Sequence, residues 1–139
     1  MRESQEILVD MPRSTLIPIL AATFWLCVVV TLFFALSPRG NIAGVNDKTL
    51  HMLAFAALTC LACAAFPFAS MIRVFFWLCL LGGAIELAQM IPEVHRDAEL
   101  ADWLADTLAI AGVLFAIKLT GFRAWLARSA LAASARGSA

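Results

Sequence analysis

Apolar residues form four long runs along the chain, separated by short polar stretches. The runs cover residues 15–37, 49–68, 71–91 and 100–119. A membrane-spanning helix needs ~20 predominantly apolar residues, because each residue adds only about 1.5 Å along the helix axis. Each run is therefore long enough to cross a bilayer. Since a helix satisfies its own backbone groups in lipid, the pattern predicts four transmembrane helices.

Turn-forming and charged residues occupy the breaks between the runs. These are Pro38, Gly40, Asn41, Pro67, Pro92 and Glu93. Connections this short make neighbouring helices antiparallel, so we expect an all-α, four-helix membrane domain over residues 15–120. Tails of residues 1–14 and 121–139 flank it. A cleaved signal peptide is the alternative for the first run, but that run exceeds the usual apolar region of about 7 to 15 residues.

Composition supports a membrane protein. Hydrophobic residues make up 63% of the chain and charged residues 14%, with a mean hydropathy of +0.89. Soluble domains carry roughly 25% charged residues. The formal net charge is zero, so there is no basic surface to attract nucleic acid.

Basic residues are distributed unevenly about the four runs, which predicts the orientation. The amino tail, the second connection and the carboxyl end hold seven of them: Arg2, Arg13, Arg73, Lys118, Arg123, Arg128 and Arg136. The first and third connections hold Arg39, Lys48 and Arg96. Because basic segments stay on the cytoplasmic side, we expect both termini in the cytoplasm and a multi-pass protein of the bacterial inner membrane.

Polar side chains gather at one end of the predicted bundle. They are Asp47, Lys48, His51, Glu86, Gln89, Arg96, Asp102 and Asp106. The first three open the second run, Glu86 and Gln89 close the third, Arg96 lies in the next connection, and the last two open the fourth. Antiparallel packing puts all of them at the outward-facing end of the protein.

The spacing of these residues gives each helix one polar face. Asp47 with His51 and Asp102 with Asp106 are four positions apart, and Glu86 precedes Gln89 by three. Residues at these spacings are neighbours on a helix surface. Ionisable groups are costly in lipid and normally face a bundle interior or cavity, so the set is a candidate binding site.

Several members of this set also have a purely structural interpretation. Asp47 and Asp102 are placed to act as helix N-caps, a role that Asp fills readily. His51 suits the membrane interface, while Lys48 and Gln89 could extend to it or bridge helices. Glu86 and Asp106 lie too far inside their helices to be caps. Arg96 is most simply a partner for the acids.

Small residues predict where the helices approach closely. Ala56, Cys60 and Ala64 form a stripe at four-residue spacing in the second run, and Gly82 and Gly83 lie in the third. We expect both to lie at helix contacts. The four cysteines all fall within runs and are expected to be unpaired packing residues.

The polar segments together resemble those of the VanZ-like membrane proteins. The similarity rests on "DKTLHMLAF", "GGAIELAQ", Arg96 and "DWLADTLAIAG", and covers roughly residues 47–112. It implies a four-helix protein of the bacterial envelope, not a particular reaction. Some VanZ-like proteins are associated with reduced susceptibility to the glycopeptide teicoplanin. This chain departs from the pattern at Asp106, where an amide is more usual, and at Ala109, where a glycine is expected.

Three functions are compatible with these residues. The first is binding of a lipid or cell-wall precursor at the outward-facing end. The second is an intramembrane enzyme with Glu86 or Asp106 as base and His51 as acid, with or without a divalent metal on the carboxylates. The third is a small proton- or cation-coupled transporter. The sequence has no phosphate-binding loop or zincin motif, so no cofactor or resident metal is expected. Binding is the interpretation that the residues favour, with membrane lipids as partners.

Overall fold

The computed structural model describes residues 13–37, 46–94, 98–121 and 128. Within them the chain is helical and has no strand. The elements are α2 (Arg13–Leu36), α3 (Asp47–Ala65), α4 (Met71–Gln89), the short 3-10 helix η1 (Pro92–Val94) and α5 (Leu100–Thr120). All four α-helices are long and apolar enough to cross a membrane. The four predicted spans are thus confirmed as helices, each shifted by a few residues.

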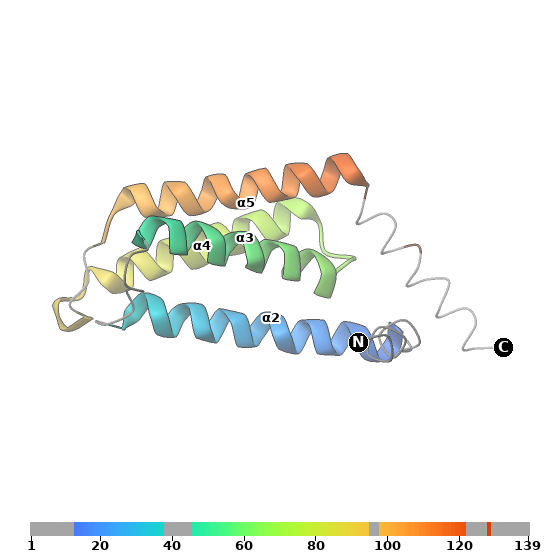
Figure 1. Ribbon diagram of the computed structural model, residues 1–139, viewed down its shortest axis with the longest axis horizontal. Helices are drawn as coiled ribbons and strands as arrows, with labels where there is room; N and C mark the ends of the chain where they lie inside the picture. Colours follow the sequence, from blue (N-terminus) through green and yellow to red (C-terminus); the bar gives the residue numbers. More distant parts are fainter. Residues whose placement is uncertain (1–12, 38–45, 95–97, 122–127, 129–139) are drawn as a thin grey trace.

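The four helices run side by side with alternating direction (Figure 1). α3 and α4 form the middle of the bundle, with α2 on one side and α5 on the other. The end of α2 meets the start of α3, and the end of α4 meets the start of α5, at the same end of the molecule. This arrangement brings the polar ends of three helices together.

Helix caps account for the observed boundaries. The Asn46 side chain accepts a hydrogen bond from the backbone N–H of Lys48 at 3.0 Å and caps α3. Ser70 caps α4 in the same way, by accepting from Arg73 N–H at 3.2 Å. α5 ends at Gly121, whose φ of +63° is a left-handed conformation that glycine adopts without steric cost.

The proposed cap roles of Asp47 and Asp102 are wrong. Asn46 already takes the capping position, so Asp47 is the first residue of α3. α5 begins one turn earlier than a cap at Asp102 requires, with Glu99 at its N-cap. Asp102 therefore lies inside the first turn of α5 with its side chain buried, which makes it available to the polar cluster described below.

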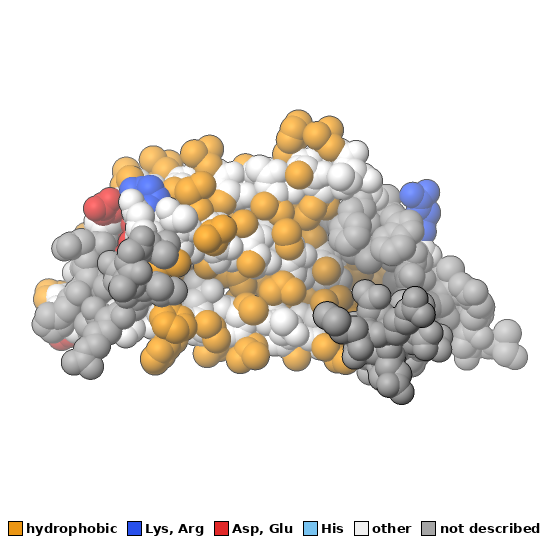
Figure 2. Space-filling model, in the orientation of Figure 1, with side chains coloured by type: hydrophobic (Ala, Val, Ile, Leu, Met, Phe, Trp, Pro, Cys, Tyr) orange, Lys and Arg blue, Asp and Glu red, His pale blue; other side chains and the backbone are white. Residues whose placement is uncertain are grey.

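Apolar side chains fill the interior and also cover the outside. Phe55, Leu58, Ile85 and Ile110 are fully buried among the helices. Figure 2 shows apolar side chains over the whole described length of the bundle, with charged groups near its ends. A surface of this kind is stable in hydrocarbon, where apolar exposure carries no cost.

The close helix contacts agree only in part with the predicted small-residue positions. Cys60, in the expected stripe of α3, is exposed, because the packed face of that helix is the one that carries Thr59 and Cys63. Gly82 does lie at a close contact: a methyl group added there would be 3.4 Å from both Phe55 and Trp103. The four cysteines, all within described helices, form no disulfide with one another.

Candidate functional site

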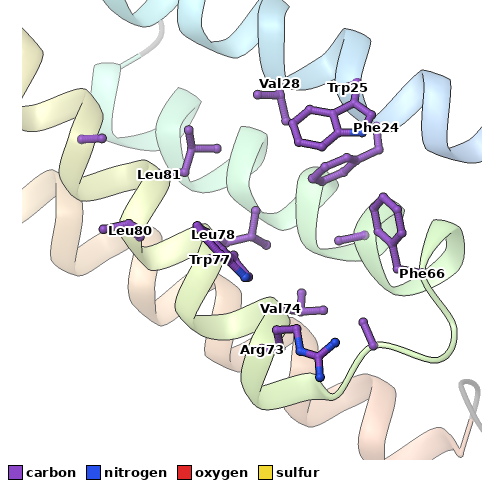
Figure 3. Close-up of a pocket in the computed structure, with 13 residues that line it drawn as sticks. Phe24, Trp25, Val28, Phe66, Arg73, Val74, Trp77, Leu78, Leu80 and Leu81 are labelled. Carbon is purple, nitrogen blue, oxygen red and sulfur yellow. The ribbon is translucent and has the colours of Figure 1, made fainter.

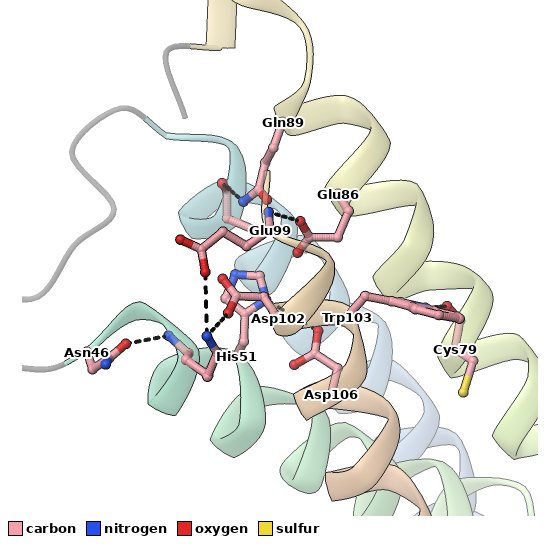
Figure 4. A network of polar contacts seen from close by, with 11 residues as sticks. Asn46, His51, Cys79, Glu86, Gln89, Glu99, Asp102, Trp103 and Asp106 are labelled. Atoms are coloured by element: carbon pink, nitrogen blue, oxygen red, sulfur yellow. Dashed lines mark hydrogen bonds and ion pairs between the residues drawn. The ribbon is translucent and has the colours of Figure 1, made fainter. Parts of the chain in front are cut away.

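Three helices bring buried polar side chains together at one end of the bundle (Figure 4). His51 comes from α3, Glu86 and Gln89 from α4, and Asp102 and Asp106 from α5. We call these five residues the polar cluster. All are buried, and only 1% of the Asp106 surface and 9% of that of Glu86 remain exposed. The helix ends meet here because α3 and α5 begin, and α4 finishes, at the same level.

The deepest contact of the polar cluster joins α3 to α5. His51 Nδ1 lies 3.3 Å from Asp106 Oδ2, and both side chains are almost completely buried. The same Asp106 oxygen faces Gly82 of α4, because a methyl group there would lie 3.5 Å from it. The absence of a side chain at Gly82 therefore leaves room for the carboxylate between α3, α4 and α5.

Lys48 joins the polar cluster at its rim. Its ammonium lies 3.0 Å from Asp102 Oδ1 and 3.5 Å from Glu99 Oε2. The Lys48 side chain is 38% exposed, while that of Asp102 is 9% exposed. The cation thus reaches a buried carboxylate from the surface.

Glu86 holds the α4–α5 connection onto the bundle. Its Oε2 accepts a hydrogen bond of 2.9 Å from the backbone N–H of Glu99, which is the residue just before α5. Glu86 also interacts electrostatically with His51, Asp102 and Asp106. The carboxylate therefore belongs to the polar cluster and also positions the start of the helix that carries both aspartates.

Gln89 and Trp103 act as supports. Gln89 Nε2 donates to the carbonyl oxygen of Ala35 at 2.9 Å and so ties the end of α4 to the end of α2. Trp103 Nε1 donates to the Cys79 carbonyl at 3.0 Å and ties α5 to the middle of α4. These bonds fix the helices whose ends carry the acids.

Among the described residues, three buried carboxylate oxygens of the polar cluster accept no hydrogen bond: Glu86 Oε1, Asp102 Oδ1 and Asp106 Oδ1. Asp102 Oδ1 is ion-paired to the Lys48 ammonium at 3.0 Å, which leaves Glu86 Oε1 and Asp106 Oδ1 unpartnered within the described part of the chain. A buried polar atom left without a partner costs about 1 to 3 kcal/mol. Such atoms are expected to bind something that donates hydrogen bonds, and a carboxylate oxygen accepts from ammonium, hydroxyl or amide groups alike.

The charge of this end is predominantly negative. Glu86, Glu99, Asp102 and Asp106 are acidic, and Lys48 is the one lysine or arginine ion-paired to them among the described residues. Within the described chain, no three His, Cys, Asp or Glu side chains are arranged to hold a metal ion.

The sequence-predicted residues are brought together to different degrees. His51, Glu86, Gln89, Asp102 and Asp106 are buried at one end, Lys48 is ion-paired at the rim, and Asp47 interacts electrostatically with His51. Arg96, the expected partner of the acids, lies outside the described residues. Gln89 bonds to backbone rather than to another member of the polar cluster.

Glu99 and Trp103 were missed as contributors. In the sequence Glu99 looks like an ordinary charged loop residue. Its backbone N–H donates to Glu86, and no sequence pattern identifies a backbone donor of this kind. The sequence feature that points to Glu99 is its position directly before the helix that carries Asp102 and Asp106. Trp103 reads as an interfacial aromatic residue, although its indole N–H bonds to Cys79 inside the bundle.

Comparisons with known proteins identify no relative. A scan against protein families, a search of curated proteins and a search of solved structures each found no match to this chain.

Proposed function

We propose that this chain is a VanZ-like protein of the bacterial inner membrane that binds a lipid-linked or cell-wall-related ligand at the polar cluster. The observation that carries the proposal is the pair of unpartnered oxygens, Glu86 Oε1 and Asp106 Oδ1, buried beside the His51–Asp106 contact. A ligand that donates hydrogen bonds to them removes the cost of leaving them unpaired.

The location of the polar cluster supports a ligand from the membrane or its surface. Glu86 and Asp106 lie within helices able to span a membrane, about two turns or less from the ends of those helices. A ligand anchored by a lipid tail reaches this level without leaving the bilayer. The excess of basic residues near the termini supports an outward-facing position for the polar cluster.

The charge of the polar cluster indicates which chemical group of such a ligand binds there. Among the described residues this end holds four acids and one ion-paired lysine, a balance that disfavours a phosphate group there. Sugar hydroxyls, amides and ammonium groups of a cell-wall precursor are hydrogen-bond donors and suit the unpartnered oxygens. We therefore assign the polar cluster to the sugar-peptide head of a precursor, with the phosphate held away from it.

A binding measurement tests this assignment. Purified protein in detergent is mixed with a polyprenyl-pyrophosphoryl disaccharide-peptide, or with the polyprenyl phosphate alone, and its melting temperature is recorded. We expect the full precursor to raise the melting temperature and the bare phosphate to leave it unchanged. The shift should vanish in Glu86→Leu and persist in Glu93→Gln, which removes a carboxylate from the exposed η1 segment at the same end.

Two results would overturn the assignment. One is an equal response to both lipids, since the head group would then play no part. The other is a shift that survives in Glu86→Leu after that variant is shown to be folded by circular dichroism, because the ligand would then bind elsewhere.

A second candidate function has one observation in its favour. In the His51–Asp106 contact a buried carboxylate orients an imidazole, as in sites where histidine acts as a general base. On this hypothesis the protein hydrolyses or transfers part of a lipid-linked substrate. Incubation of the same precursor with the parent and with His51→Gln, followed by mass spectrometry, distinguishes turnover from binding. No product from the parent protein would leave binding as the function.

A further inference from the structure

A groove with almost entirely apolar walls lies between α2 and α4, away from the polar cluster (Figure 3). Phe24, Trp25 and Val28 form the α2 wall, and residues of α4 from Arg73 to Ala84 form the other. Its volume is about 620 Å³. Ligand pockets usually measure about 300 to 1,000 Å³, so the groove is large enough for a bound molecule.

The packing of the helices explains why the groove is there. α2 and α4 run in the same direction and make few contacts with each other, because α2 packs mainly on α3 and α4 mainly on α5. Small side chains line the space between them, including Ala62 of α3 and Ala84 of α4. The aromatic rings of Trp25 and Trp77 stand at the walls without filling it.

Among the described residues that line the groove, Arg73 is the one that carries a charge. It lies in the first turn of α4 and is exposed, and among the described residues none forms an ion pair with its guanidinium. A charged group at a membrane boundary is stabilised by an anion. The planar guanidinium binds a phosphate through two parallel hydrogen bonds, a geometry that lysine cannot match.

The length of the groove matches one leaflet of a bilayer. Arg73 and Ala84 are eleven residues apart on α4, which corresponds to roughly 16 Å along the helix. Half of a hydrocarbon core of ~30 Å is about the same distance. A molecule with its anionic group at Arg73 and its apolar part along the groove therefore has the dimensions of one phospholipid chain.

We propose that the groove binds one acyl chain of an anionic phospholipid, whose phosphate pairs with Arg73. This site is separate from the polar cluster, because Arg73 begins α4 and Glu86 lies near its other end. The lipid fills the space between α2 and α4. It is a structural partner of the bundle and does not depend on the ligand proposed for the polar cluster.

Tryptophan fluorescence tests the site directly, since Trp25 and Trp77 line the groove. Trp103→Phe and Trp125→Phe remove the other two tryptophans. The protein is placed in phosphatidylcholine vesicles that contain increasing amounts of phosphatidylglycerol with brominated acyl chains, which quench nearby indoles. A parallel series uses brominated phosphatidylcholine among unbrominated phosphatidylglycerol. We expect brominated phosphatidylglycerol to reach half-maximal quenching at a mole fraction about fivefold lower than that of brominated phosphatidylcholine.

Two pairs of variants separate the charge from the groove. Arg73→Gln should abolish the preference for phosphatidylglycerol, whereas Lys118→Gln should keep it, because Lys118 lies at the same end of the bundle on α5 and does not line the groove. Ala84→Phe should reduce quenching by both lipids at least twofold by filling the groove. Ala116→Phe, an exposed position of α5, should not.

Several results would overturn the proposal. Equal quenching by the two brominated lipids would indicate ordinary surrounding lipid. Weak quenching by both would mean that protein, from this chain or a second copy, covers the groove. Loss of the preference in Lys118→Gln as well as in Arg73→Gln would assign it to the general charge of that end. Should Arg73→Gln not fold, unchanged quenching in Ala84→Phe would be sufficient to reject the site.

Discussion

His51 of α3 and Asp106 of α5 meet inside the bundle, with His51 Nδ1 3.3 Å from Asp106 Oδ2, although 55 positions separate them in the chain. Both side chains are buried, and the missing side chain at Gly82 of α4 leaves room for the Asp106 carboxylate. It therefore couples three helices at the level where the unpartnered Glu86 oxygen also lies. Stability and ligand binding are expected to depend on the same few atoms.

Asp106 should tolerate an amide better than an apolar side chain. Asn retains an oxygen and gains a donor, so Asp106→Asn keeps a partner for His51 and should remain close to the parent in stability. Asp106→Leu removes that partner and should lower the free energy of unfolding by about 1 to 3 kcal/mol. Thermal melts of both variants in detergent measure the difference. An equal loss in both would show that the negative charge is required, as it would be if a cation bound there.

Lys48 and Asp102 should be energetically coupled. Lys48→Met leaves the buried Asp102 carboxylate without its cation, while the double variant with Asp102→Leu removes both charges. We expect the double variant to be more stable than the sum of the single changes predicts. Denaturant titrations in mixed micelles give the free energy of unfolding of the parent, the two single variants and the double variant, which together form a double-mutant cycle. The same cycle made with Lys118 in place of Lys48 is the control and should be additive.

Gln89 should hold the end of α2. Gln89→Met conserves the shape of the side chain but cannot donate to the Ala35 carbonyl, so the cost should be about 0.5 to 1.5 kcal/mol. Hydrogen exchange followed by mass spectrometry should show faster exchange in the last turn of α2 and unchanged exchange in the middle of α5. Unchanged exchange in α2 would mean that packing alone holds it.

Gly82 should be restricted in size, unlike Gly112. A methyl group at Gly82 meets Phe55, Trp103 and Asp106 at 3.4 to 3.5 Å, whereas nothing lies within 4 Å of one at Gly112. Gly82→Leu should overpack this contact and cost about 1 to 3 kcal/mol. Gly112→Leu faces open space and should be nearly neutral or stabilising, because leucine favours a helix more than glycine does. Similar melting temperatures for the two variants would contradict the observed packing.

The proposed orientation is tested by phosphatase fusions, which are active only outside the cytoplasm. If basic residues keep their ends of the helices inside, fusions at Ala139 should be inactive and fusions near Asn41 or Val94 active. The reverse pattern would move the polar cluster to the cytoplasmic side. It would refute an outward-facing ligand site without altering the contacts within the polar cluster.

The number and extent of the helices were predictable from local properties of the sequence. Long apolar runs bounded by turn residues have one stable form in lipid, because only a helix satisfies its backbone within a single segment. The position of His51, Glu86 and Asp106 at the same end of the bundle also follows from counting residues along antiparallel helices. The exact start of α3 was not predictable from the sequence, because Asn46 and Asp47 are both good caps. Only the observed bond from Lys48 N–H to the Asn46 side chain distinguishes them.

The sequence by itself determined that the chain has four helices long and apolar enough to span a membrane and that its acidic side chains within them gather at one end of the bundle, since both follow from hydropathy and position along each helix. Only the tertiary structure decided which of these groups meet. The rotation of each helix about its own axis depends on side chains from other helices, such as Phe55 and Trp103 against Gly82. That rotation pairs His51 with Asp106, places Lys48 beside Asp102, and leaves Glu86 Oε1 without a hydrogen-bond partner among the described residues.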